Sequence, residues 1–370
     1  MLKRGRKFKV KIIHCSDLHL DSKMQSNLDS KKAKERRDEI LITYQNMVEY
    51  AKRNGVNIIL IAGDLFDKAS ITKKAQNIVL DSIISNPDID FLYLKGNHDE
   101  TNFMLDIESL PTNLKLFSNQ EWTNYRYGNI TISGIEFGEL ENYEIYNTLM
   151  LSKNEFNIVT LHGQDSKYDQ KDKTEVINIQ NLKNKNIDYL ALGHIHSYKQ
   201  EKLDSRGIYC YSGCLEGRGF DECGEKGFVL LDIDEETLKY TSKFIPISKR
   251  NLYEINVDIS DTFTSLDVER KVDEKLIDIS KDSLIKIVLT GKVDIDSERD
   301  ITYLAKKYNE LYYFAKIYDK TSLKIDYMTY ENDASLKGEF IRLVLKQNLE
   351  EEEQSKIITT GIKALLGEEL

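Results

Sequence analysis

VNIILIAGD, residues 56–64, is an almost entirely apolar stretch that ends in a glycine and an aspartate. An isoleucine-rich apolar run of this length is typical of a strand buried inside a layered fold. Gly63 has no side chain, so the backbone can come close to other groups at that point. The stretch therefore predicts a buried strand that delivers the carboxylate of Asp64 to the edge of a sheet.

The residues on either side repeat this pattern, with strand-like apolar runs separated by longer segments of helical character. Residues 31–55 form an amphipathic segment ended by Gly55, and we expect one helix there and another over residues 71–85. Strand–helix–strand repetition implies parallel pairing within a layered α/β domain. The other strands expected in this region are 8–17, 89–99, 129–135, 156–163, 187–194, 207–213 and 227–234.

Polar residues cluster where five of these predicted strands end. Open α/β sheets bind ligands in the crevice outside the carboxyl ends of their strands. Five separate segments are thus expected to deliver polar side chains to one edge of the fold, which is the layout of an active site. The five clusters are SDLH (16–19), GD (63–64), GNHD (96–99), LHG (161–163) and GHIH (193–196).

Histidines and carboxylates dominate these clusters. The chain has six histidines, and five of them lie in the clusters: His19, His98, His162, His194 and His196. A donor set of imidazoles and carboxylates suits Mn, Fe or Zn. A pair of bridged divalent ions needs roughly seven or eight ligands, one of them a shared carboxylate, and Asp64 is the natural bridge. The alternative, a cluster of mutually satisfied polar side chains, is disfavoured because five clusters occur together.

Three neighbouring residues are expected to have other roles. His14 precedes the first cluster on the same predicted strand, and we expect it to be buried or to support a ligand rather than to be one. Asp21 and Asp99 are interpreted as turn or helix-cap carboxylates, with a supporting contact to the site as the alternative for Asp99.

The motifs DLH (17–19), GDLFD (63–67), GNHD (96–99), LHG (161–163) and GHIH (193–196), in this order, resemble the signature of the calcineurin-like metallophosphoesterase superfamily. The resemblance implies an α/β fold, a four-layer α-β-β-α sandwich, with two divalent metal ions. It also implies that a hydroxide between the ions attacks phosphorus while a dyad of His98 and Asp67 assists. The implied ligands are Asp17, His19, Asp64 and His196 for the first ion, and Asp64, Asn97, His162 and His194 for the second.

Two further stretches, IIHCSDLHLDS (12–22) and YSGCLEGRGFDECGEKGFVLLDID (211–234), resemble SbcD-type DNA repair exonucleases, with Cys214 where those proteins usually have serine. This resemblance implies a manganese-dependent DNA exonuclease and single-strand endonuclease that works with an SMC/Rad-type ATPase and can form a homodimer. A helix over residues 36–52 is one possible dimer surface. Arg218 is a candidate contact to substrate phosphate.

Three segments are expected along the chain. Residues 1–245 would form the nuclease domain, residues 246–332 a small α+β capping domain, and residues 333–370 two terminal helices. The apolar side chains of the terminal helices suit docking on the coiled coil of the ATPase, and packing against their own chain is the alternative. They are Leu343, Val344, Leu345, Ile357, Ile358, Ile362, Leu365 and Leu366.

Composition narrows the class of protein. The formal net charge of −10 is unlike that of a dedicated nucleic-acid binder, although bound divalent ions would add positive charge locally. The four cysteines form no CxxC pair, and we expect reduced thiols in a cytoplasmic protein without a signal peptide or membrane span. Two other functions remain open: a phosphodiesterase of a small nucleotide or lipid-linked substrate, and a mainly ATPase-binding subunit.

Overall fold

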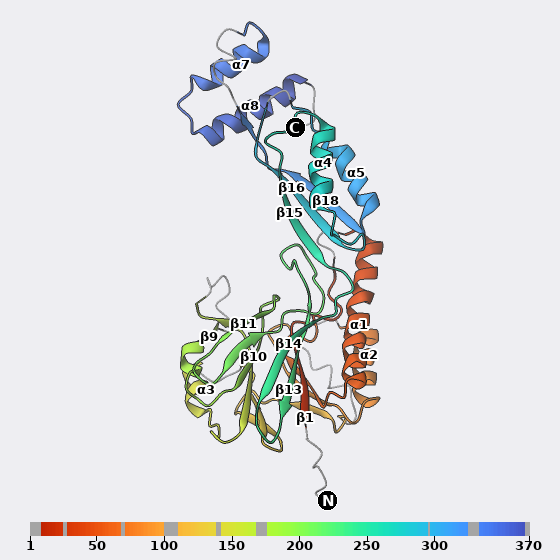
Figure 1. Cartoon of the computed structure of the whole chain (residues 1–370), viewed down its shortest axis with the longest axis vertical. Helices are drawn as coiled ribbons and strands as arrows, with labels where there is room; N and C mark the ends of the chain where they lie inside the picture. Colours follow the sequence, from red (N-terminus) through yellow and green to blue (C-terminus); the bar gives the residue numbers. More distant parts are fainter. Residues whose placement is uncertain are drawn as a thin grey trace, which may run out of the picture. The chain divides into compact units, whose positions relative to one another are not determined.

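The computed structural model describes residues 9–24, 28–67, 71–99, 110–137, 142–167, 176–294, 297–324 and 333–366. The chain divides into two compact units, Met1–Asn251 and Leu252–Leu370 (Figure 1). Among the described residues, no helix is both long and apolar enough to cross a membrane.

The first sheet of unit 1 has six strands in the order β14-β13-β1-β2-β3-β4. The strands β1 to β4 pair in parallel, so the carboxyl ends of β1, β2 and β3 meet at one edge, whereas β13 pairs antiparallel with both β1 and β14. Their bounds are β1 Lys9–Cys15, β2 Ile58–Ala62, β3 Asp90–Leu94, β4 Leu114–Leu116, β13 Gly227–Asp234 and β14 Tyr240–Pro246.

The second sheet also has six strands, in the order β11-β12-β10-β7-β6-β5. The inner strands are parallel, while β5 and β11 run antiparallel at the two edges. Their bounds are β5 Thr123–Tyr127, β6 Ile130–Gly134, β7 Phe156–His162, β10 Tyr189–Gly193, β11 Lys199–Lys202 and β12 Ile208–Tyr211. A short parallel pair, β8 Gln164–Asp165 and β9 Val176–Ile177, lies beyond β7 in the chain.

The two sheets pack face to face, and helices cover their outer faces. Residues from both sheets, among them Leu60 and Ile158, form the core between them. The helices α1 Ser30–Arg53 and α2 Lys73–Ile84 pack on the first sheet, while α3 Asn142–Thr148 and the 3₁₀ helix η1 Ile179–Leu182 pack on the second. This α/β arrangement, with sheets flanked by helices, confirms the predicted fold class.

Local chemistry explains where the two long helices begin and end. The side chain of Asp29 accepts hydrogen bonds from the backbone N–H groups of Lys31 and Lys32, which caps the start of α1. The helix stops before Gly55, whose φ of 63° lies in the left-handed region. Thr72 caps α2 by accepting a hydrogen bond from the backbone of Ala75.

Unit 2 contains a three-stranded parallel sheet in the order β15-β16-β18, formed by β15 Leu252–Asp258, β16 Leu284–Thr290 and β18 Phe314–Asp319. The helices α4 Ser265–Lys275 and α5 Ile301–Leu311 alternate with these strands, so this part of the unit is a βαβαβ arrangement. A small parallel pair, β17 Lys292–Asp294 and β19 Ser322–Lys324, completes the strands described in this unit.

Two helices lie at the C-terminal end of the described chain: α7 Leu336–Leu345 and α8 Glu351–Leu366. They pack on each other through Ile341, Val344, Ile358 and Ile362. Self-packing therefore accounts for part of the apolar surface noted in the sequence, and the side chain of Leu343 stays 54% exposed.

Candidate metal centre

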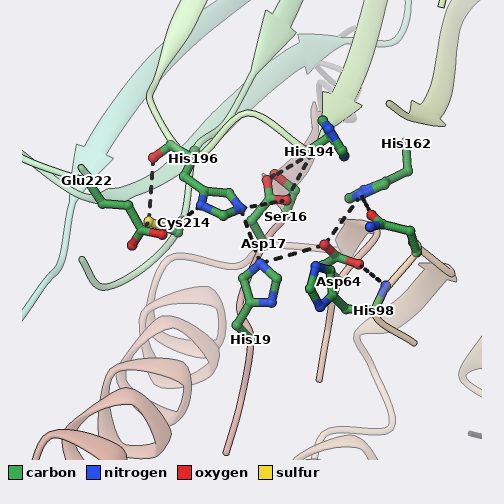
Figure 2. Close-up of polar contacts among 12 residues, drawn as sticks. Ser16, Asp17, His19, Asp64, His98, His162, His194, His196, Cys214 and Glu222 are labelled. Carbon is green, nitrogen blue, oxygen red and sulfur yellow. Dashed lines mark hydrogen bonds and ion pairs between the residues drawn. The ribbon is translucent and has the colours of Figure 1, made fainter. Parts of the chain in front are cut away.

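The fold brings the five polar clusters to one place, where the carboxyl ends of strands from both sheets meet (Figure 2). In the first sheet, Asp17 and His19 follow β1, Asp64 and Asp67 follow β2, and Asn97 and His98 follow β3. In the second sheet, His162 ends β7, and His194 and His196 follow β10.

The turns that carry these residues have unusual backbone angles. The φ angles of Asp17, His19, Asp64 and His194 are 53°, 43°, 53° and 96°, which side-chain-bearing residues rarely adopt. Such conformations persist where the surroundings enforce them, and they are common at functional sites. Here the backbone N–H groups of Asp17 and His19 donate to the carbonyl oxygens of Gly63 and Asp64, at 3.1 and 3.0 Å. These hydrogen bonds tie the turn after β1 to the turn after β2.

Gly63 is required between β2 and Asp64. Its φ is 93°, and a Cβ atom at this position would overlap the ring of His162. The backbone and the imidazole can pack this closely only because the residue is glycine.

Asp17, His19 and His196 form the first group of possible metal ligands, with one donor atom from each within 4.8 Å of the others. The Nε2 atoms of His19 and His196 are 3.2 Å apart, and Nε2 of His196 is 3.8 Å from Oδ1 of Asp17. Asp17 and His19 are completely buried.

Asp17, Asp64 and His162 form a second such group. The Oδ2 atom of Asp64 is 3.6 Å from Nε2 of His19 and 3.5 Å from Nε2 of His162, so it lies between the two histidines (Figure 2). Nε2 of His162 is also 3.2 Å from Oδ1 of Asn97.

His194 lies beside the second group without joining it. Its ring centroid is 5.4 Å from that of His162, and its backbone N–H donates to both carboxylate oxygens of Asp17, at 2.9 and 3.1 Å. A third group of closely spaced possible ligands consists of His19, Asp67 and His98, and among the described residues none of the three groups includes the His194 ring. The structure therefore brings His194 to the site mainly through its backbone contact with Asp17.

The donor set fits bound cations. Nδ1 of His162 donates to the carbonyl of Ala62 at 2.9 Å, which leaves the lone pair of Nε2 directed at Asp64. Within the part of the chain that the structure describes, the buried Nδ1 of His19 has no hydrogen-bond partner. Buried carboxylate oxygens and imidazole nitrogens from both sheets converge here, which is the donor set that a divalent cation binds.

Charge states in the site also favour a cation. Burial would raise the pKa of Asp64, but hydrogen bonding and attraction from His162, with attraction from His19, outweigh it and hold that pKa below its ordinary value. Burial lowers the pKa values of His19 and His194. At neutral pH the carboxylate is therefore ionised and these two imidazoles are neutral, the forms in which they bind metal.

His98 and Asp67 form a pair beside these groups. Nδ1 of His98 is 3.3 Å from Oδ1 of Asp67, and the His98 side chain is 30% exposed. The nearby carboxylate of Asp67 raises the pKa of His98 above its ordinary value of 6.5, and the nearby imidazole lowers the pKa of Asp67. The imidazole of His98 is therefore partly open to solvent at the edge of the site.

Asp99, His14 and Asp21, which we expected to have roles other than binding metal, each have a defined structural contact. Asp99 is buried and accepts hydrogen bonds from the backbone N–H groups of Leu65, Phe66 and Gly96, which joins the turns after β2 and β3; burial raises its pKa to about 6. His14 is buried against the Tyr189 hydroxyl at 2.9 Å, and burial lowers its pKa to about 3. Asp21 accepts from the backbone N–H of Thr72 at the start of α2.

Two supporting contacts, those of Ser16 and Glu222, were not predicted from the sequence. Ser16 donates to Oδ2 of Asp17 at 2.5 Å, and Glu222, buried on the loop after β12, accepts from Nδ1 of His196 at 2.7 Å. Glu222 also binds Arg218, whose Nη2 lies 2.9 Å from Oε1. No spacing or periodicity separates Glu222 from the other acidic residues of this loop, so a single sequence carries no signal for its role.

Comparison with known proteins agrees with this geometry. Residues 10–198 match the family model "Calcineurin-like phosphoesterase". "Uncharacterized metallophosphoesterase YhaO" of Bacillus subtilis is 27% identical over 246 residues, which cover 62% of this chain and 58% of the relative, less than two thirds of its length.

Two other relatives cover more of the chain. "DNA double-strand break repair protein Mre11" of Sulfurisphaera tokodaii is 27% identical, covering 77% of this chain and 74% of the relative. The SbcCD nuclease subunit of Staphylococcus epidermidis is 25% identical, covering 68% of this chain and 74% of the relative. The family model matches half of this chain. The chain therefore belongs to the calcineurin-like phosphoesterase family, whose members are metal-dependent hydrolases of phosphoesters, and this agrees with the prediction from its five motifs.

Proposed function

We propose that this protein is a two-metal-dependent DNA nuclease of DNA repair, with exonuclease activity and endonuclease activity on single strands. The observation that carries the metal-dependent chemistry is the position of Asp64 Oδ2, between Nε2 of His19 and Nε2 of His162. The choice of DNA as substrate is supported by the relatives whose names include Mre11 and the nuclease SbcCD.

The first cation would be held by Asp17, His19, Asp64 and His196, and the second by Asp64, Asn97, His162 and His194. Two divalent ions at this position supply Lewis-acid stabilisation of phosphoryl charge and lower the pKa of water. We propose Mn²⁺ because the donors combine imidazole nitrogen with carboxylate and amide oxygen.

His98 would protonate the leaving oxygen of the phosphodiester. Oδ1 of Asp67 lies 3.3 Å from Nδ1 of His98, so a protonated imidazole would keep its Nδ1 proton toward this carboxylate and transfer the proton on Nε2. The neutral imidazole left after transfer keeps its Nδ1 proton and its contact with Asp67. The pair therefore orients the general acid and raises its pKa toward the working range.

Arg218 would contact a phosphate of the substrate. Glu222 binds its Nε and Nη2 atoms, and among the described residues Nη1 makes no hydrogen bond. The side chain is 20% exposed, so its free edge can reach a ligand. A guanidinium group offers paired donors that match phosphate oxygens.

An SMC/Rad-type ATPase is the proposed protein partner, bound through α7 and α8. These helices retain exposed apolar side chains after packing on each other, which suits docking against another helical protein. They are Leu336, Leu343, Ile357 and Leu365, exposed by 67%, 54%, 38% and 46%. We also propose a homodimer through the face of α1 that carries Ile42, which is 48% exposed.

A cytoplasmic location is part of the proposal. All four cysteines are free thiols, and Cys15, Cys210 and Cys214 are buried. Free thiols accord with a reducing compartment.

The proposal is tested by incubating the protein with linear duplex DNA and with circular single-stranded DNA in the presence of Mn²⁺. We expect degradation of both substrates and loss of degradation in a His98→Ala variant. Mn²⁺-loaded protein that leaves both DNA substrates intact would refute the nuclease assignment. Turnover of bis(p-nitrophenyl) phosphate in that protein would then indicate a phosphodiesterase of small substrates.

A further inference from the structure

Glu222 contacts both His196, a proposed metal ligand, and Arg218, the proposed contact to substrate phosphate. Its Oε1 atom lies 2.7 Å from Nδ1 of His196, 3.1 Å from Nε of Arg218 and 2.9 Å from Nη2 of Arg218. Its Oε2 atom accepts the backbone N–H of Arg218 at 2.7 Å. The carboxylate is buried, so both oxygens depend on these donors.

These contacts determine which nitrogen of His196 carries a proton. Nδ1 of His196 is close to Glu222 at 2.7 Å and to Nη2 of Arg218 at 3.2 Å. An ionised carboxylate only accepts and a guanidinium only donates, so Nδ1 cannot hydrogen-bond to both. The shorter contact and the existing bond of Arg218 Nη2 to Glu222 assign the proton to Nδ1. Nε2 of His196 then presents a lone pair to Asp17 and His19.

We propose that Glu222 is a positioning residue that sets two features at once: the metal-binding tautomer of His196 and the orientation of the Arg218 guanidinium. The inference rests on the proposed function, because it assumes that His196 binds a metal and that Arg218 binds phosphate. A carboxylate behind a metal-binding histidine orients the ring and increases its basicity. Here the same carboxylate also fixes the cationic group beside the metal site.

A charged carboxylate of this length is required at position 222. Glutamine would place an amide N–H₂ group against donors of Arg218 or of its backbone, because only one of its terminal atoms accepts. Aspartate would keep the charge, but its side chain is shorter by one methylene group, so its carboxylate would lie farther from His196. We therefore expect glutamine to impair both functions and aspartate to impair them less.

The loop that carries Glu222 is held in place at its other end. Gly217 accepts a hydrogen bond from Arg36 of α1 through its carbonyl oxygen, at 2.9 Å. Glu216 accepts from Arg36 at 2.9 Å and from Thr43 at 2.6 Å, and all three side chains are buried. The position of the carboxylate is therefore fixed by the fold before a substrate binds.

The first test measures the tautomer of His196 without metal. Full-length protein with ¹⁵N-labelled histidines is freed of metal with a chelator, and the signal of His196 is assigned by its loss in a His196→Gln variant. We expect the Nδ1–H tautomer in the wild type and a shift toward Nε2–H in Glu222→Ala. An Nε2–H tautomer in the wild type, or the same tautomer in both proteins, would overturn the inference.

The second test measures Mn²⁺ affinity by calorimetric titration of the same full-length proteins. We expect Glu222→Gln to weaken one of two Mn²⁺ sites by about 10–100-fold, and Glu222→Asp to weaken it less. Asp221→Asn, which changes the neighbouring exposed carboxylate, is the matched control and should bind Mn²⁺ like the wild type. Arg218→Lys should raise KM for a phosphodiester while leaving Mn²⁺ affinity unchanged.

The outcomes separate this inference from the proposed function. Suppose that the wild type binds two Mn²⁺ ions and hydrolyses phosphodiesters, and that Glu222→Gln binds Mn²⁺ with unchanged affinity. This result would overturn the proposed role of Glu222 and leave the proposed function standing. Wild-type protein that hydrolyses no phosphodiester would overturn the proposed function, and the metal-free tautomer measurement would still decide the role of Glu222. If Glu222→Gln does not fold, the comparison of Glu222→Asp with Asp221→Asn decides the Mn²⁺ test.

Discussion

The Nε2 atoms of His19 and His196 lie 3.2 Å apart although the two residues are 177 positions apart in the chain and follow strands of different sheets. Glu222 directs the lone pair of His196 toward His19, and the buried Nδ1 of His19 lacks a hydrogen bond within the described residues. Two imidazole nitrogens this close can both be ligands of one cation.

We expect this pair to make the protein more stable when Mn²⁺ is present. A ligand that binds only the folded state stabilises it by about 2.7 kcal/mol at a free concentration of 100 times Kd. His196→Ala should retain less than the two metal equivalents expected for the wild type, and should show a smaller rise in Tm. Metal analysis and thermal unfolding with and without chelator measure both. A His196→Ala variant that responds to Mn²⁺ like the wild type would contradict the assignment of this ligand.

His98→Ala should lower kcat for phosphodiester hydrolysis by about 10²–10⁴-fold, because the variant loses its general acid. Its Mn²⁺ content should remain that of the wild type, since His98 is not among the proposed ligands. Steady-state kinetics and metal analysis on the same preparation test this. Loss of bound Mn²⁺ in His98→Ala would show instead that His98 belongs to the metal site.

Asp67→Asn should change the pH dependence of the reaction. Asp67 raises the pKa of His98 above 6.5, so the protonated acid is present below this raised pKa and is lost as pH rises through it. Removing the carboxylate charge lowers the pKa of His98, and the alkaline limb of the rate profile should move to lower pH. The measurement is kcat/KM against pH at saturating Mn²⁺, and an unmoved alkaline limb would exclude His98 as the titrating group.

Arg36→Ala should destabilise the folded chain by about 3–5 kcal/mol, because it removes the cation paired with the buried carboxylate of Glu216, while Glu39 keeps its pair with Arg250. Arg53→Ala is the matched control on the same helix. Its pair with Glu49 is exposed, and its loss should change the free energy of unfolding by less than about 1 kcal/mol. Denaturant unfolding of both variants measures the difference; equal effects would show that the buried network is not a stabilising element.

Leu343→Glu on α7 should abolish binding to an SMC-type ATPase while leaving Mn²⁺-dependent hydrolysis of a small phosphodiester unchanged. Leu343 is exposed and lies outside the buried contact between α7 and α8, so the substitution spares that contact. Ile84→Glu on α2, at a 61% exposed residue, is the control. Co-purification with the ATPase is the measurement, and equal retention of the two variants would place the partner surface elsewhere.

Much of the fold follows from local patterns in the sequence. The buried strands β2 and β10 read as apolar runs that end at glycine, and α1 reads as an amphipathic segment. The edge strands β5, β11 and β14 were not predicted. Their residues are only partly buried and alternate with exposed ones, so they lack the apolar signal of a central strand.

The sequence by itself determined the order of five polar motifs and placed each at the end of an apolar strand, because strand patterning and turn chemistry are local properties. Only the tertiary structure decided which atoms face one another. The distance from Asp64 to His19 and His162, and the use of Glu222 behind His196, depend on how two six-stranded sheets pack and where their loops return. Those positions are set by contacts between residues far apart in the chain, which no local pattern encodes.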